Sequence, residues 1–310
     1  MNAPVAILAN PNASGWGMQR TDLERLARAS GDQLIKLDSE GRWLMRLSSL
    51  DTPRLCIYGG DGTLSSVIAQ LEREDLLGRF ELGLIPGGTG NDFARSIGLH
   101  GLSLAEAYRY ATSADAVPVD LIDVLNGTSR LIVNAATAGF GGLVSGDVTE
   151  ADKRRWGAMA YWVAAFTHLT SLPQYSIELN LDDGRGGNFD VFGLAITSGR
   201  YVGGGFPVSP DAIVNDGLLN VTVIPVMPVG ELLAAGVDFT LNRNSEPRRI
   251  VTFKTRSVHV TATPRLPYSL DGESQQSEHA EFAIRPAAVN VTCHPQATGV
   301  WKSRKRHAVT

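Results

Sequence analysis

The chain has 310 residues with a formal net charge of −4, and 43% of its residues are hydrophobic against 19% charged. This balance predicts a packed globular protein of one or two domains, and it argues against a general nucleic-acid binder. Two distant cysteines argue against a disulfide framework. The chain begins without a signal-peptide pattern and has no apolar run near the roughly 18 residues of a spanning helix. We therefore expect a cytoplasmic protein with no transmembrane segment.

The first 124 residues alternate strand and helix patterns. Apolar runs typical of strands lie at 5–9, 34–37, 55–58 and 82–85. Helical periodicities follow at 21–29, at 43–50, from Thr63 and from Asn91. This alternation predicts a parallel sheet with helices on both faces.

The pattern changes after residue 124, because strand-like runs now follow one another with turns between them. They lie at 131–135, 175–181, 191–197, 219–224, 250–254, 258–263, 281–284 and 289–293. Such runs are typical of an antiparallel β-sandwich. We predict an α/β plus mainly β fold: a nucleotide-binding α/β domain at 1–124, a β-rich domain at 125–294, and a cleft between them. The prediction leaves open whether the tail at 295–310 returns to the first domain.

The turn "GGDGT" at 59–63 contains too many glycines for a simple connection. Glycines let backbone N–H groups approach a ligand closely, and a following helix N-terminus favours an anion such as phosphate. The carboxylate of Asp61 fits there if it holds Mg²⁺ or accepts a proton. The alternative is an ordinary helix cap, and this turn alone leaves the two interpretations even.

Two further polar turns follow strands of the same predicted sheet. One is "PGGTGNDFAR" at 86–95, which adds a second carboxylate, Asp92, and the other is "ANPNASGWG" at 9–17. Three such turns at one sheet edge are hard to explain as independent connections. The chain contains no Walker loop, and no G-x-G-x-x-G opens its first helix.

"GGDGT" at 59–63 and "PGGTGNDFAR" at 86–95 are followed by "VDLIDV" at 119–124, the run at 201–221 and "LDGE" at 270–273. Together these motifs resemble the diacylglycerol kinase catalytic-domain family. Bacterial lipid kinases and sphingosine kinases are close relatives in that family, and NAD kinases are more distant ones. The motifs arrive in family order over residues 5–290. "GGDGT" by itself would also admit an NAD kinase.

The resemblance implies that ATP lies against the strand-end loops. The first loop departs from the family pattern, because it is one residue longer before Ser14 and lacks a basic residue after Gly15. Arg20 is the candidate to supply that charge. The implied nucleotide-binding residues are Asn10, Gly59, Gly60, Asp61, Gly62, Thr63, Gly88, Thr89 and Asn91.

The resemblance also implies an acidic network for Mg²⁺ and a base for the acceptor hydroxyl. Phosphoryl transfer depends on positioning and charge neutralisation, so carboxylates near the phosphates are needed. The implied base is Glu273 with Asp271 beside it, although "LDGE" is also an ordinary hairpin turn. The candidate catalytic residues are Glu273, Asp271 and Asp61, and the candidate metal ligands are Asp92, Asp120, Asp216, Ile213 and Leu218. Of these ligands, Asp216, Ile213 and Leu218 would hold a structural Mg²⁺. The alternative is that Asp216 lies in an ordinary turn that binds no metal.

The resemblance gives the β-rich domain the lipid substrate. A helical stripe at 153–169, preceded by basic residues, is either an interfacial helix for an anionic membrane or a helix packed on the sandwich. The basic tail at 301–307 is either a membrane tether or a solvated end. The sequence leaves open whether the chain forms a homodimer.

The sequence therefore predicts an ATP- and Mg²⁺-dependent lipid kinase that works peripherally at a membrane, with diacylglycerol as the leading acceptor. An NAD kinase is one alternative, and a non-catalytic nucleotide or lipid sensor is another.

Overall fold

The computed structural model describes residues 4–38, 40–48, 52–125, 130–139, 173–228, 230–232, 234–235, 250–297 and 299–300. The helical stripe at 153–169 and the basic tail at 301–307 lie outside these residues. Within the part of the chain that is described, every helix is too short or too polar to span a bilayer.

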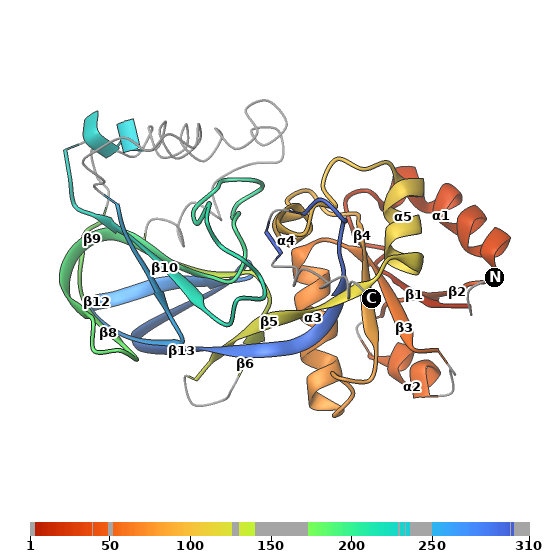
Figure 1. The fold of residues 1–310 in the computed structure, drawn as a ribbon, viewed down its shortest axis with the longest axis horizontal. Helices are drawn as coiled ribbons and strands as arrows, with labels where there is room; N and C mark the ends of the chain where they lie inside the picture. Colours follow the sequence, from red (N-terminus) through yellow and green to blue (C-terminus); the bar gives the residue numbers. More distant parts are fainter. Residues whose placement is uncertain are drawn as a thin grey trace, which may run out of the picture.

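The N-terminal half is a parallel sheet in the order β4-β3-β1-β2 (Figure 1). Its strands are β1 (Ala6–Ala9), β2 (Gln33–Lys36), β3 (Arg54–Gly59) and β4 (Glu81–Pro86). The helices are α1 (Trp16–Ser30), α2 (Arg42–Ser48), α3 (Asp61–Arg73), α4 (Asp92–Ser96) and α5 (Leu104–Ser113). The predicted alternation is confirmed, and α5 is a helix that the analysis of the sequence did not predict.

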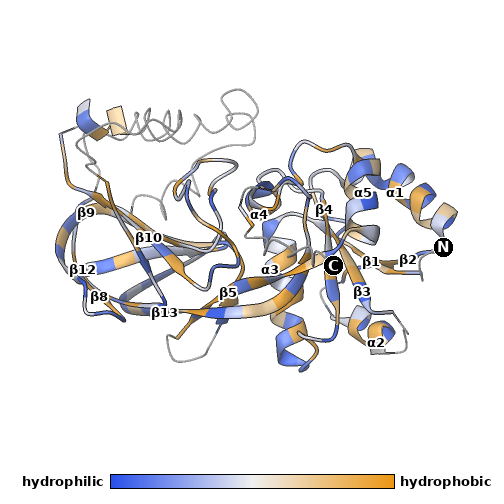
Figure 2. Cartoon of the chain, viewed as in Figure 1, coloured by the Kyte–Doolittle hydropathy of each residue, from blue (hydrophilic) through white to orange (hydrophobic). Residues whose placement is uncertain are grey.

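Helices cover both faces of this sheet. Alternate strand residues point to opposite faces, so Leu8 and Ile57 pack with α2 and α3, whereas Ile7 and Tyr58 pack with α1 and α5. Figure 2 shows hydrophobic residues on the central strands and a mixed surface on α1. The sequence pattern therefore builds two apolar layers around one sheet.

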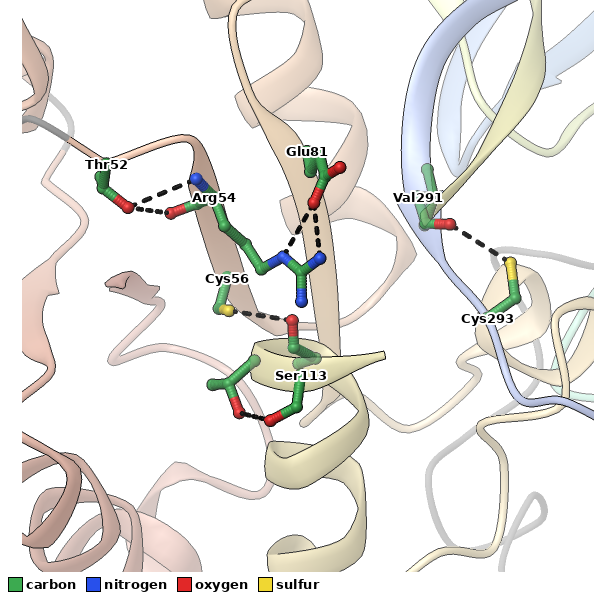
Figure 3. Close-up of polar contacts among 9 residues, drawn as sticks. Thr52, Arg54, Cys56, Glu81, Ser113, Val291 and Cys293 are labelled. Carbon is green, nitrogen blue, oxygen red and sulfur yellow. Dashed lines mark hydrogen bonds and ion pairs between the residues drawn. The ribbon is translucent and has the colours of Figure 1, made fainter. Parts of the chain in front are cut away.

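Figure 3 shows polar contacts at the start of this sheet and against α5. The Arg54 guanidinium donates two hydrogen bonds to Glu81 on the neighbouring strand, at 3.1 and 2.5 Å. The Cys56 thiol faces the carbonyl of Ala111 at the end of α5 (3.4 Å), and burial raises its pKa to about 12. Cys56 and Cys293 are both buried and form no disulfide, and burial with a raised pKa makes Cys56 an inert core thiol.

The C-terminal half is an antiparallel β-sandwich around a second apolar core. Its strands are β6 (Arg130–Ile132), β7 (Ala135–Gly139), β8 (Tyr175–Leu181), β9 (Gly186–Thr197), β10 (Leu219–Pro225), β11 (Val251–Thr255) and β12 (Ser257–Leu270). The expected strand at 131–135 is divided between β6 and β7. Asp271 separates them, because its carboxylate accepts the N–H groups of residues 133, 134 and 135.

Two strands cross between the halves: β5 (Ala116–Val124) and β13 (Glu273–Thr292). The runs expected as separate strands at 281–284 and 289–293 are one strand, which pairs first with β12 and then, from Asn290, in parallel with β4. A bulge between Arg285 and Val289 lets β13 bend there. Val289 and Val291 pack in the same core as β1 and β3, so the chain re-enters the α/β half on this strand. Figure 1 shows β13 in blue along the lower side of the sandwich and then curving up into the α/β half.

Candidate active site

The three glycine-rich turns meet at one edge of the parallel sheet, as predicted. The N–H of Asn10 donates to the carbonyl of Tyr58 (3.0 Å), and the N–H of Gly87 donates to the carbonyl of Gly59 (2.8 Å). The N–H of Gly15 reaches across to the carbonyl of Gly87 (2.9 Å). The loops after β1, β3 and β4 therefore form one continuous backbone surface.

Close backbone approach explains why two of these positions are glycine. A Cβ on Gly88 would lie 2.5 Å from the Cα of Gly60, and a Cβ on Gly87 would lie 2.6 Å from the ring of Tyr58. A Cβ atom does not fit at either distance. The loop after β4 can therefore lie against β3 and the loop after it only if residues 87 and 88 are both glycine.

Side chains of the predicted nucleotide site hold the three loops together. Asn10 Nδ2 donates to Thr63 Oγ1 (2.8 Å), which joins the first loop to α3. Asn91 has a left-handed backbone (φ 53°), and its amide bonds both the N–H (3.1 Å) and the carbonyl (2.5 Å) of Gly88. Thr89 Oγ1 donates to Ser14 Oγ at 3.1 Å.

Asp61 and Asp92 form a pair of neighbouring carboxylates beside these loops. Asp61 accepts the N–H groups of Asp92 (2.8 Å) and Phe93 (3.0 Å), so it caps the short helix α4. Asp92 is 6% exposed, and its Oδ2 accepts the N–H of Gly204 (2.9 Å). Burial, followed by the charge of Asp92, raises the pKa of Asp61 to about 7.

The donor set of this pair fits a Mg²⁺ ion. Mg²⁺ is commonly held by one or two carboxylates together with substrate phosphates, and a cation would relieve the repulsion between Asp61 and Asp92. No group of three His, Cys, Asp or Glu side chains suited to a metal occurs among the described residues, so such an ion would depend on the phosphates for further ligands.

Asp271 is predicted as a catalytic residue, but its carboxylate is fully engaged. One oxygen accepts Ser65 Oγ (2.5 Å) and the N–H of Val133 (2.7 Å), and the other accepts the N–H groups of Asn134 and Ala135. Four donors from α3 and the β6–β7 link therefore converge on one carboxylate. Asp271 joins the two halves and holds the turn between β12 and β13.

Glu273, the other residue of that motif, pairs with an arginine and is not among the residues that line the cavity. Its carboxylate lies 2.9 Å from Nη1 of Arg130, and its side chain is 74% exposed. Glu273 is the first residue of β13, two positions after Asp271.

A cavity of about 280 Å³ is lined by residues of both halves. Its lining includes the carboxylates of Asp61, Asp92 and Asp271 and the loop at 202–206. The rest of the wall comes mainly from apolar residues of β7, β9 and β10. These wall residues are Ala135, Ala138, Phe192, Leu194, Ala195, Val202, Phe206, Val208, Ile224 and Leu232.

Asp120 and Asp216 lie together in a second place and belong to the junction between the halves. Asp120 is 3% exposed and accepts the N–H groups of Gly217 (2.7 Å) and Ala287 (2.8 Å). Burial, and then the charge of Asp216, raises its pKa. The family resemblance implies one network of Asp120 with Asp61 and Asp92, whereas the hydrogen bonds of Asp120 run to the loop at 211–218 and to Ala287 of β13.

The residues around Asp216 do not fit the expected structural Mg²⁺. Its Oδ1 accepts the N–H of Leu218 (3.2 Å), and its Oδ2 lies 3.0 Å from Nζ of Lys254. Ile213 lies in the same loop. The carboxylate that would meet a cation is therefore already paired with an ammonium group.

The apolar wall and the anchors Ser65 and Gly204 were not predicted from the sequence. Gly204 lies in the glycine-containing run at 201–221, so a signal was present, but its bond to Asp92 depends on folding. Ser65 and the small wall residues of β7 and β9 carry no pattern that separates a cavity wall from a core.

Comparisons with known proteins match both halves. Residues 4–124 match the diacylglycerol kinase catalytic domain, and residues 134–293 match the YegS C-terminal NAD kinase beta sandwich-like domain. A probable lipid kinase YegS-like of Serratia proteamaculans is 28% identical over 94% of this chain and 95% of its own length. Another, of Xanthomonas oryzae pv. oryzae, is 32% identical over 75% of this chain and 76% of its own.

Solved structures share the fold. A diacylglycerol kinase from Bacillus anthracis aligns with a TM-score of 0.70 and 22% identity, over 94% of this chain and 97% of that one. An NAD kinase from Archaeoglobus fulgidus in complex with ATP aligns with a TM-score of 0.55 and 11% identity, over 94% and 95%. At these identities the likeness concerns the fold alone.

Proposed function

This chain belongs to the YegS-like family of lipid kinases, and from that premise we propose that it transfers the γ-phosphoryl group of ATP to a lipid hydroxyl. Diacylglycerol, which would become phosphatidic acid, is the leading acceptor. The observation that carries the proposal is a cavity whose lining combines three aspartates with a mainly apolar wall. Such a lining suits a molecule with a polar hydroxyl group and an apolar body.

The three loops form the nucleotide side of the proposed site. The N-cap of α3 is Gly60, which offers no capping side chain. The N–H of Thr63 donates to the carbonyl of Gly60 (3.0 Å), so the N–H groups of Asp61 and Gly62 are the ones proposed to meet a phosphate. Thr63 and Asn10 are already bonded to each other, which fixes the loops before a nucleotide arrives. The proposed nucleotide residues are Asn10, Gly59, Gly60, Gly62, Thr63, Gly88, Thr89 and Asn91.

We assign the acceptor proton to Asp61 and the metal to Asp92. A general base works best when its pKa is near the operating pH, and Asp61 has a pKa of about 7 beside the cavity. Mg²⁺, when bound, would neutralise charge on the phosphates. Asp271 positions the turn between β12 and β13 beside the cavity, because all four of its donors are structural.

The resemblance instead assigns the proton to Glu273, and that assignment stays a prediction. The exposure of Glu273 and its ion pair with Arg130 favour Asp61. Rotation of the Glu273 side chain toward the acceptor is the step that the alternative requires.

The proposed setting is a membrane surface, where the acceptor would be taken from the lipid layer. Formation of homodimers stays a prediction from the resemblance.

The test is transfer of radiolabelled γ-phosphate from ATP-Mg²⁺ by the purified protein. The acceptors are diacylglycerol, phosphatidylglycerol, a sphingoid base and a prenol in mixed micelles, with NAD in parallel. Label is expected on diacylglycerol in the wild type and to be nearly absent with Asp61→Asn. The matched control is Asp22→Asn, an exposed aspartate of α1 that pairs with Arg25.

Label on NAD alone would contradict a lipid acceptor and favour the NAD kinase alternative. Binding of ATP without label on any acceptor would favour the sensor. Label on a different lipid would keep the reaction and replace the acceptor.

A further inference from the structure

We propose that the ammonium group of Lys254 takes the place of a structural divalent cation in the loop at 211–218. The loop would then be held in its folded form without metal, unlike the site that the family resemblance implies. The proposal concerns folding and does not depend on the kinase assignment.

The contacts of Lys254 are those of a small hard cation. Its Nζ lies 3.0 Å from Oδ2 of Asp216 and donates to the backbone carbonyl of Asp211 at 3.4 Å. A carboxylate together with backbone carbonyls is the ligand set that oxygen-seeking cations take in protein loops. The ammonium group therefore occupies the position where a divalent cation would be attracted most strongly by the oxygen atoms of the loop.

The fold places Lys254 there by strand register. Lys254 lies on β11, where it pairs with Asn220 of β10, and β10 starts at Leu219, three residues after Asp216. The backbone of Lys254 is thus fixed beside the end of the loop, and only its flexible stem must be ordered. Its side chain is 41% exposed and that of Asp216 is 18% exposed, so the pair lies at the rim with its carboxylate turned inward.

The negative charge around the loop explains why a positive group would stabilise its folded form. Asp120 is buried next to Asp216 and carries a second carboxylate, which accepts the N–H of Gly217 and, on β13, that of Ala287. Two neighbouring carboxylates repel each other unless a positive group lies close. Lys254 provides that group, and a Mg²⁺ ion at Asp216 would have to displace it.

The interaction of Lys254 matters for stability because this loop contacts three parts of the junction between the two halves. Asp120 lies on the crossing strand β5, and its own N–H donates to the carbonyl of Val214 (2.9 Å). The N–H of Val214 donates to the carbonyl of Gly299 (2.9 Å), near the end of the described chain. A loosened loop would therefore release β5, the β13 bulge and the C-terminal segment together.

The experiment measures the melting temperature of nucleotide-free protein in chelator and in excess MgCl₂. The measured quantity is the Mg²⁺-induced shift of a protein minus that of the same protein carrying Asp216→Asn, which removes contributions from cation sites elsewhere. For the wild type we expect a difference below about 1 °C. For Lys254→Met we expect a lower melting temperature in chelator, by about 1–3 °C, and recovery of at least half of that loss with Mg²⁺.

Lys36→Met, which removes an exposed lysine of β2, is the matched control and is expected to show neither effect. Two results would overturn the proposal. One is a wild-type shift of several degrees that disappears with Asp216→Asn, because the loop would then bind the ion despite Lys254. The other is a Lys254→Met protein that melts like the wild type in chelator and does not respond to Mg²⁺.

Discussion

Two groups of aspartates lie between the halves of this protein, and they differ in what balances their charge. Asp120 and Asp216 are matched by backbone N–H groups and by Lys254. Asp61 and Asp92 accept backbone N–H groups as well, but the described residues that line their cavity include no lysine or arginine. The first group is a structural unit, whereas in the second group burial and the charge of Asp92 raise the pKa of Asp61, an effect that a cation bound beside the two carboxylates would oppose. Both groups consist of aspartates, so residue type does not distinguish the structural group from the functional one. The charges that surround each group make this distinction.

The largest effect is expected from the pair of Asp61 and Asp92. Asp61→Asn should lower kcat for phosphoryl transfer by about 10²–10⁴-fold, because the amide cannot accept the acceptor proton. The loss of helix capping should cost about 1 kcal/mol of folding free energy, since only one oxygen remains to accept an N–H of α4. Steady-state kinetics with the lipid acceptor, at a temperature where both proteins are folded, measures this.

Glu273→Gln and Asp120→Asn are the comparison variants. We expect Glu273→Gln to keep kcat within a few-fold, because its carboxylate pairs with Arg130. Asp120→Asn should lower the melting temperature and leave kcat per folded molecule little changed. A Glu273→Gln protein that loses transfer as severely as Asp61→Asn would return the base to Glu273.

A second prediction concerns the loops that face the pair. Gly88→Ala should raise the KM for ATP about tenfold or more, because its Cβ would lie 2.5 Å from the Cα of Gly60 and would push the two loops apart. Gly78→Ala is the control, since a Cβ there meets nothing within 4 Å. An unchanged KM for Gly88→Ala, measured at saturating acceptor, would separate these loops from nucleotide binding.

A third prediction sharpens the role of the apolar wall. Ala195→Leu should raise the KM for the lipid roughly five- to tenfold with the KM for ATP unchanged, because the added atoms project into the cavity. Overpacking a filled core costs about 1–3 kcal/mol, but a site facing open space should show little loss of melting temperature. A protein that is strongly destabilised with both KM values altered would show that Ala195 faces packed interior.

The fold was predictable from residues near one another in the sequence. Alternating apolar strands and amphipathic helices fix the α/β layers, and the glycine turns mark one sheet edge because parallel strands end together. The partners of the acids were not predictable, because they come from distant segments: Asp92 binds Gly204, and Asp271 binds Ser65. The same holds for Asp216, whose neighbour Lys254 is brought close only by the pairing of β10 with β11.

The smallest expected effect is the pH dependence of stability, which separates the pair from ordinary paired carboxylates. The pKa of Asp61 is raised in the folded protein to about 7, above its usual unfolded value of about 3.9. The folded state therefore binds the proton more tightly, so stability falls as pH rises from about 4 to 7 and levels off above that. With allowance for solvent screening, the contribution should be about 1–2 kcal/mol.

Denaturant unfolding of the wild type and of Asp61→Asn between pH 5 and pH 8 measures this as a difference in slope. Asp61→Asn should lose the decline, since an amide does not titrate. MgCl₂ should also flatten the wild-type decline, because a cation beside Asp92 favours the ionised form of Asp61. Parallel profiles for the two proteins would mean that Asp61 is ionised across this range, and the proton acceptor would then have to be sought among carboxylates with ordinary pKa values.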